Sequence, residues 1–312
     1  MVWVARAFVN PVEARLRAGW RLVVFILVFA ATSRLVTAVA FGTVGRLQHG
    51  SLRWWVLRGV IVMIAATLSV WLVRRWVDRR SFRSLGIRVD ERAWRDSVVG
   101  FAISAAMVGT VVALCAMFGF LEVDSISWKE GFGSALAALP LWFFGIGISV
   151  AWSEELGLRG YVLQNLSDGI GLVWAVLLSC VFYGAIHMAN PNSTVLSGVL
   201  IGAVGYLRVL GWLRTGQLWL SMGMHAGWDF LLGPVLGLSV SGVHTEGLVH
   251  PTLSGPSWVT GGTFGPEAGV ALLPALGGGL LLMHLWTAGR VGTPWTRAAE
   301  TRRHRKKERQ PS

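Results

Sequence analysis

The sequence predicts an all-α integral membrane protein, a bundle of about eight transmembrane helices with both termini in the cytoplasm. Of its 312 residues, 54% are hydrophobic and only 14% are charged, and the mean hydropathy is +0.57. Such a chain is too apolar for an ordinary soluble domain. Several stretches also reach the roughly 20 apolar residues that a helix needs to cross a bilayer.

Eight apolar windows follow one another along the chain, at about 20–42, 54–73, 97–119, 135–166, 171–190, 195–213, 217–236 and 268–289. The first window follows arginines, as a signal peptide would, and Ala38, Val39 and Ala40 resemble a cleavage site. Because Arg34 interrupts the apolar run, we expect an uncleaved first span. Its guanidinium would reach the head groups from the outer end of that span.

Basic residues crowd the segment before the first window, the connector from about 76 to 96, and the last residues of the chain. The positive-inside rule places these three segments in the cytoplasm. The loop around Glu122, Asp124, Lys129 and Glu130 is slightly acidic, and the loop from about 237 to 267 has no Lys or Arg, so both are expected outside. The sequence therefore predicts three regions: a basic cytoplasmic segment (1–19), a membrane-embedded domain (20–290) and a basic cytoplasmic tail (291–312). The protein is expected in the cell membrane.

The net charge of +12 is accounted for by basic residues beside the spans, where they meet anionic lipid head groups. We therefore expect the bilayer, and no nucleic acid, as a partner. Cys115 and Cys180 lie in apolar segments and predict no disulfide. A short interfacial helix is expected at about 91–97. The Gly-, Ser-, Thr- and Pro-rich loop up to Pro266 is expected to be irregular, with His244, Glu246 and His250 solvated.

Six polar residues stand out inside these apolar windows: Glu154, Glu155, Arg159, His187, His225 and Asp229. An ionised side chain at the centre of a bilayer costs roughly 2.5 to 3.5 kcal/mol. These six residues are therefore expected to face a wet, protein-lined cavity rather than lipid. Carboxylates and imidazoles together suit either water activation or metal binding, and the residues alone leave both open.

Helical spacing assigns different surroundings to the two adjacent glutamates. Glu155 lies four residues before Arg159 and can form an ion pair with it, whereas Glu154 points about 100° away around the helix. The same spacing stacks His225 over Asp229 and Tyr183 over His187. We expect one glutamate to be held in an ion pair and its neighbour to be left free to act.

A common depth for these residues requires the fourth helix to continue past Glu154 to about Asn165, ending near the turn residues 167–169. Glu154 and His187 then lie roughly 21 and 28 Å from that turn at 1.5 Å per residue. His225 is only about 13 Å beyond the next turn, so the helices must tilt or their turns must lie at unequal heights.

The ordered motifs resemble those of the CPBP family of intramembrane proteases. They are Glu154-Glu155-x-x-x-Arg159, an aromatic four residues before His187, and His225-x-x-x-Asp229. The family includes type II CAAX prenyl endopeptidases and the bacterial Abi group of bacteriocin-processing and self-immunity proteins. The stretch from Gly261 to Glu267 also looks like one that recurs in bacterial members, but we attach no chemistry to it. The resemblance covers about 75–290, and its catalytic part covers about 150–232.

The resemblance implies catalytic roles for Glu154, His187, His225 and Asp229, with Glu155, Arg159 and Tyr183 supporting them. Glu154 would be the general base, polarising a water with His187, while His225 and Asp229 stabilise the oxyanion or complete a metal site. The four catalytic residues are also the candidate ligands for Zn²⁺, although the chain has no H-E-x-x-H motif. A metal-free glutamate-activated water would use the same residues, and no organic cofactor is expected.

Two positions depart from the family pattern. Many members carry Asn where this chain has Asp229, and an ionised carboxylate accepts hydrogen bonds but cannot donate one to an oxyanion. Asp229 would then be protonated, orient His225, or bind a metal. Tyr183 stands where Phe is common, and its hydroxyl needs a partner if it is buried.

The leading hypothesis is an intramembrane endopeptidase, with or without a metal, acting on hydrophobic or lipid-anchored substrates. A proton- or ion-coupled transporter would use the same ionisable groups, and a non-catalytic immunity or scaffold protein would keep the same fold. We find no internal symmetry of the kind common in transporters, which favours the enzyme. The sequence does not identify the substrate or the oligomeric state.

Overall fold

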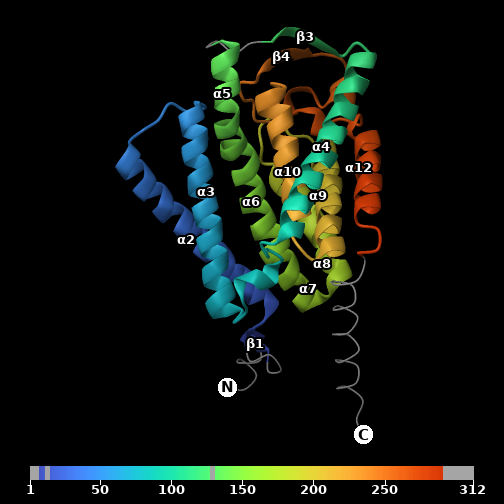
Figure 1. Cartoon of the computed structure of the whole chain (residues 1–312). Helices are drawn as coiled ribbons and strands as arrows, with labels where there is room; N and C mark the ends of the chain where they lie inside the picture. Colours follow the sequence, from blue (N-terminus) through green and yellow to red (C-terminus); the bar gives the residue numbers. More distant parts are fainter. Residues whose placement is uncertain (1–6, 11–14, 127–130, 291–312) are drawn as a thin grey trace.

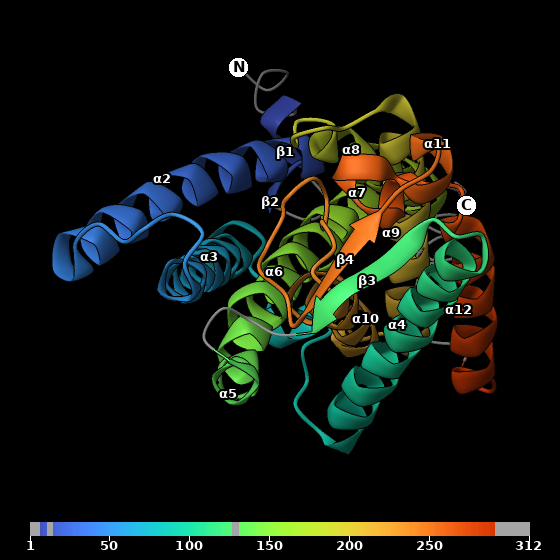
Figure 2. The same ribbon diagram turned by 90° about the horizontal axis from the view of Figure 1, so that it is seen from above.

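The computed structural model describes residues 7–10, 15–126 and 131–290. The predicted tail (291–312) and the loop residues Lys129 and Glu130 lie outside the described residues. Helices form an elongated bundle with a small sheet across one end, while the described chain begins near the opposite end (Figure 1). Viewed from above, α2 (Ala18–Val44) lies at the edge of the bundle beside α3 (Leu52–Leu72) (Figure 2).

The remaining elements follow in chain order. The α-helices after α3 are α4 (Glu91–Met117), α5 (Phe132–Trp142), α6 (Ser149–Glu154), α7 (Leu163–Ile170), α8 (Leu172–His187), α9 (Val195–Thr215), α10 (Trp219–Phe230), α11 (Ser257–Thr260) and α12 (Leu272–Trp286). The π-helical segments are η1 (Val73–Val77), η3 (Phe143–Ile148), η4 (Glu155–Val162) and η5 (Leu231–Val235), and the 3₁₀ turns are η2 (Phe82–Leu85), η6 (Gly262–Phe264) and η7 (Pro266–Ala268). The strands β1 (Val9–Asn10) and β2 (Arg15–Leu16) pair with each other, as do β3 (Leu121–Ile126) and β4 (Val249–Leu253).

The chain is a helical membrane protein. Within the described residues, five helices are long and apolar enough to cross a bilayer: Ala18–Val44, Leu52–Val77, Glu91–Met117, Leu136–Ile170 and Val195–Thr215. The other three predicted windows also contain helices, but α8 and α12 have only 16 and 15 residues, and α10 has 12 before η5 extends it. The predicted count of eight spans therefore stays a prediction.

Helix α10 lies inside the bundle, packed against α4, α9 and α6. Its residues from Leu220 to Asp229 are all buried. Small residues allow the close approach of α10 to α4, because a Cβ added at Gly223 would collide with the carbonyl oxygen of Ser97, and one at Gly100 with that of Leu220. This packing fixes the position of the polar side chains on α10.

The fourth window forms one long helical stretch, from α5 through η3, α6 and η4 to α7. As predicted, it continues past Glu154, and it ends at Ile170, where Gly171 has a φ of +87°. Two parts of this stretch are π-helical, and the second begins at Glu155. Short π-helical segments inside α-helices are frequent at functional sites because the extra residue re-aims side chains.

Two expectations about local structure are wrong. The loop after α10 is not wholly irregular, because β4 pairs with β3 in a two-stranded antiparallel sheet, so the fold is not strictly all-α. The pairing joins segments more than 100 residues apart, and β4 contains Pro251, which argues against a strand, so local sequence signals do not reveal it. The expected interfacial helix at 91–97 is the first part of α4, begun by Asp90, whose side chain accepts from the Ala93 amide at 2.9 Å.

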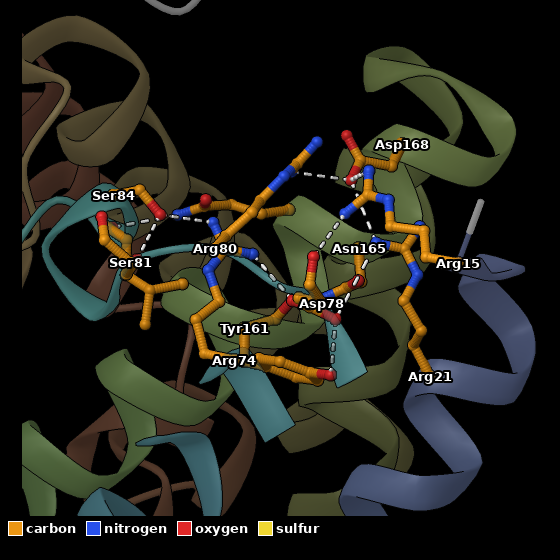
Figure 3. Close-up of polar contacts among 12 residues, drawn as sticks. Arg15, Arg21, Arg74, Asp78, Arg80, Ser81, Ser84, Tyr161, Asn165 and Asp168 are labelled. Atoms are coloured by element: carbon orange, nitrogen blue, oxygen red, sulfur yellow. Dashed lines mark hydrogen bonds and ion pairs between the residues drawn. The ribbon is translucent and has the colours of Figure 1, made fainter. Parts of the chain in front are cut away.

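An ion-pair cluster ties α2, the end of α3 and α7 together (Figure 3). Its centre is Asp78, which accepts hydrogen bonds from Arg74 at 2.8 Å, Tyr161 at 3.1 Å and Asn165 at 3.3 Å. Its second carboxylate, Asp168, lies 3.2, 3.3 and 2.9 Å from Arg15, Arg21 and Arg80. Asp78 is 1% exposed, so its contacts are shielded from water and from salt. The cluster anchors the otherwise weakly packed α2 to the helix that carries Glu154.

We predict that Asp78→Asn destabilises the protein by on the order of 3 kcal/mol, because it leaves buried Arg74 without its counter-charge. Thermal or denaturant unfolding in detergent micelles measures this loss. The matched control is Glu91→Gln, which removes an exposed pair with Arg95. Equal stability of the two variants would contradict the structural role of the cluster.

Candidate functional site

A cavity of about 280 Å³ lies among the helices and brings together the polar residues that the sequence singled out. Its wall includes Glu154, Tyr183, His187, His225 and Asp229. These residues come from α6, α8 and α10, so three separate segments of the chain converge on one space. Apolar side chains complete the wall, including Ile146, Val150, Ile201 and Val204.

Glu155 lies beneath this cavity and is completely buried. Its Oε1 lies 3.3 Å from Arg159 Nη1, so the predicted ion pair is present, and 3.0 Å from His225 Nδ1. Arg208 Nη1 lies 3.9 Å from the same oxygen. One carboxylate thus joins its own helix to α9 and α10.

Glu154 has different surroundings, although it is the next residue. Its side chain is 31% exposed, and its Oε2 accepts a hydrogen bond from the Tyr183 hydroxyl at 3.0 Å. That hydroxyl accepts in turn from Arg208 Nη1 at 2.5 Å, so the buried phenol has both a donor and an acceptor. The guanidinium of Arg159 stacks over the Tyr183 ring at 4.2 Å. Glu154 is therefore oriented by Tyr183 but keeps an open side towards the cavity.

His225 links the two glutamates to Asp229. Because the Glu155 carboxylate can only accept, the proton of this contact must be on His225 Nδ1. The other ring nitrogen, Nε2, lies 3.8 Å from Glu154 Oε2 and 3.5 Å from Asp229 Oδ2. A lone pair facing two carboxylates would be repelled, so a proton or a water molecule must lie between these groups. This corner of the cavity is suited to holding a polarised water.

His187 ends α8 at the rim of the cavity. Its Nδ1 donates to the Tyr183 carbonyl at 2.8 Å, since a carbonyl oxygen can only accept. The neutral ring then has its acceptor lone pair on Nε2. The structure therefore brings all four predicted catalytic residues to one cavity. Of the predicted supporting residues, Glu155 and Tyr183 contact them directly, and Arg159 contacts Glu155 and Tyr183.

The turn before α10 is covered by the connector that precedes α4. Gln217 and Leu218 are buried, and the Leu218 amide donates to the Gly86 carbonyl at 2.8 Å. From this turn α10 brings His225 to within 3.8 Å of Glu154. The expectation that the helices tilt or that their turns lie at unequal heights stays a prediction.

Several polar residues of the cavity wall were not predicted as part of the site, among them Arg58, Arg208 and Glu267. The only sequence feature that could have indicated a role for Arg208 is its position as a lone arginine in an apolar window. Glu267 lies in the stretch to which no chemistry was assigned, and its carboxylate accepts from Trp228 Nε1 at 2.8 Å and from the Ser241 hydroxyl at 2.5 Å. It joins the loop after η5 to α10 at the cavity wall.

Zinc ligands lie about 2.0 to 2.2 Å from the ion when they are histidine nitrogens or carboxylate oxygens. In the described part of the chain, no group of three or more His, Cys, Asp and Glu side chains is arranged to hold a metal ion. The predicted ligand set thus does not fit a three-ligand centre as it stands. The role of Zn²⁺ stays a prediction, and the mechanism below uses the side chains alone.

Residues 136–231 match the sequence profile described as type II CAAX prenyl endopeptidase Rce1-like. The resemblance to this protease family is confirmed. The matched segment begins in the helix that carries Glu154 and ends just after Asp229, so it contains every predicted site residue. The match to the Rce1-like family supports protease chemistry at this cavity.

A curated relative extends the similarity without adding an activity. The chain is 27% identical over 173 residues to the uncharacterized protein YyaK of Bacillus subtilis (strain 168). The match covers 53% of this chain and 56% of that protein, so it spans about half the length of each. Because YyaK is described as uncharacterized, no substrate or partner transfers from it.

We predict that Glu155→Gln lowers stability by on the order of 3 kcal/mol and also lowers any activity of the cavity, because it leaves Arg159 with no buried counter-charge. Thermal unfolding in detergent tests this. Glu154→Gln is the matched control, since it is the same change one residue away, on a side chain with no arginine within ion-pair distance among the described residues. A Glu155→Gln variant as stable as Glu154→Gln would contradict the anchoring role.

Proposed function

We propose that the chain is an intramembrane endopeptidase that hydrolyses peptide bonds of hydrophobic or lipid-anchored substrates. The observation that carries this proposal is the division of labour between two adjacent carboxylates. Glu155 is sealed in an ion pair, whereas Glu154 lines the cavity beside two histidines. A partly exposed carboxylate next to imidazoles, in a cavity with room for water and substrate, is the arrangement that general-base hydrolysis requires.

Glu154 acts as the general base. A water in the cavity donates one hydrogen bond to Glu154 and a second to the free Nε2 lone pair of His187. The water oxygen attacks the carbonyl carbon of the scissile bond, and its proton passes to Glu154. Glu154 then returns that proton to the leaving amine, which completes hydrolysis. The Tyr183 hydroxyl holds Glu154 in place throughout.

His225 supplies the positive end of the site. When its Nε2 is protonated, it donates towards the developing oxyanion, while Glu155 holds the opposite side of the ring. Asp229, 3.5 Å from Nε2, orients the ring. Many family members carry Asn at the position of Asp229. To orient His225, the side chain at this position needs only a hydrogen-bond acceptor, and both the Asp carboxylate and the Asn amide oxygen provide one.

The proposed setting is the cell membrane, with eight spans, cytoplasmic termini and a substrate that enters from the bilayer. The concentration of arginines at the end that carries α7, and their absence from the loop between η5 and α11, support this orientation. The lipid bilayer and a hydrophobic or lipid-anchored peptide are the proposed partners, and nucleic acid is not.

Glu154→Gln is expected to lower the rate of peptide cleavage by about 10²- to 10⁴-fold, because the amide cannot accept the water proton. The assay uses the purified protein in proteoliposomes and a fluorogenic membrane peptide. The control variant Glu122→Gln changes an exposed glutamate of β3 and should cleave normally. Normal cleavage by a correctly inserted Glu154→Gln protein would remove Glu154 as the base.

Asp229→Asn is expected to retain activity within about tenfold of the original protein, because an amide still orients His225 by hydrogen bonding. Cleavage rates are measured together with metal content before and after chelation. A loss beyond 100-fold, accompanied by loss of bound metal, would instead make Asp229 a ligand.

A further inference from the structure

Arg58 is a charged residue inside an apolar helix, and it has no acidic partner in the described chain. It lies on α3, about 9 Å along the helix from Leu52. Its side chain lines the cavity that holds Glu154 and interacts with that carboxylate only at a distance. Within the described residues, the Arg58 guanidinium lies over the ring of Trp55, at 5.2 Å, and near that of Trp54, at 6.0 Å. An intramembrane cation kept in this way indicates a binding function.

The platform under Arg58 is rigid. Trp55 is buried and packs with Trp142 and Ile146. Two glycines let α3 lie directly against the Glu154 helix: a Cβ on Gly145 would be 3.1 Å from the Trp55 carbonyl carbon, and one on Gly59 would be 2.9 Å from Ser149 Oγ. Because the backbone and the tryptophans are fixed, the guanidinium has a defined place on the cavity wall.

The other charges of the cavity wall are already engaged. Glu154 accepts from Tyr183, Asp229 faces His225, and Glu267 accepts from Trp228 and Ser241. The second guanidinium of the wall, that of Arg208, donates to the Tyr183 hydroxyl and lies near Glu155. Among the charged side chains that line this cavity, Arg58 is the cation left for a ligand.

We propose that Arg58 binds a carboxylate group of the peptide substrate and thereby sets the preference of the site. This inference rests on the proposed peptidase function and names the substrate as a peptide with a negative charge close to the cleaved bond. A cation–π contact with an indole uses none of the guanidinium N–H groups as hydrogen-bond donors, and the N–H edge matches a carboxylate with two parallel hydrogen bonds. Low polarity around the pair strengthens it.

The carboxylate has two chemical sources, the free C-terminus of a peptide and the side chain of Asp or Glu. The test therefore uses two pairs of membrane peptides of otherwise equal sequence. One pair differs by a C-terminal acid or amide. The other has an amidated C-terminus and differs by an internal Glu or Gln. The pair whose two members differ in kcat/KM shows whether the bound carboxylate is the C-terminus or an acidic side chain.

For the discriminated pair, kcat/KM should be about 10- to 100-fold higher for the charged peptide. Arg58→Gln should bring that ratio close to one, mainly through KM, and Arg58→Lys should restore part of it because the positive charge is kept. Equal kcat/KM for both members of both pairs in the unaltered protein would overturn the proposal. An equal loss on charged and neutral peptides in Arg58→Gln would also overturn it, because that is the effect of lost packing or of a changed field at Glu154.

Binding separates this inference from the peptidase function. In the Glu154→Gln background, the Kd of each peptide is measured without turnover, with and without Arg58→Gln. If the charged peptide binds more tightly and this preference depends on Arg58, the subsite is supported, whether or not the protein cleaves the peptide. Absence of cleavage would refute only the peptidase function. Charge-independent binding together with normal cleavage would refute the subsite alone. If Arg58→Gln fails to fold, the same ratios in the unaltered protein and in Arg58→Lys still decide.

Discussion

The buried carboxylate of Glu155 is the contact on which the site depends. In an interior without water, an ionised group is tolerated only when opposite charges and donors surround it. Arg159 supplies a positive charge at 3.3 Å and His225 an N–H donor at 3.0 Å, and Arg208 adds a second positive charge at 3.9 Å. Because these partners come from the residue's own helix, α9 and α10, one carboxylate sets the relative position of three segments.

This anchoring separates two side chains of the same chemical type. Glu155 is held as a structural ion, so Glu154, next to it, is turned towards the cavity and meets a phenol and an imidazole instead of an arginine. Tyr183 connects the two environments, because it donates to Glu154, accepts from Arg208 and stacks beneath Arg159. A second polar cluster around Asp78 fixes the far end of the same helical stretch. Glu154, the proposed general base, is thus positioned from both directions.

The sequence predicted features that depend on helical spacing and on hydropathy, but not those that arise from contacts between distant segments. Helical spacing predicted the pairing of Glu155 with Arg159, and hydropathy predicted the places of the main helices. Spacing says nothing about which helices become neighbours, so the contact of Arg208 with Tyr183 was not foreseen. The β3–β4 pairing joins distant segments for the same reason. The turn before α10 has ordinary turn residues, and its burial against the connector before α4 is not visible in the sequence.

A double-mutant cycle between Glu155 and Arg159 tests the central claim most directly. The free energies of unfolding of Glu155→Gln, Arg159→Gln and the double variant are measured in the same detergent. The account predicts that the two changes are strongly non-additive, with a favourable coupling of about 1 to 3 kcal/mol between carboxylate and guanidinium. Additive effects, with a coupling indistinguishable from zero, would mean that this ion pair does not hold the site together.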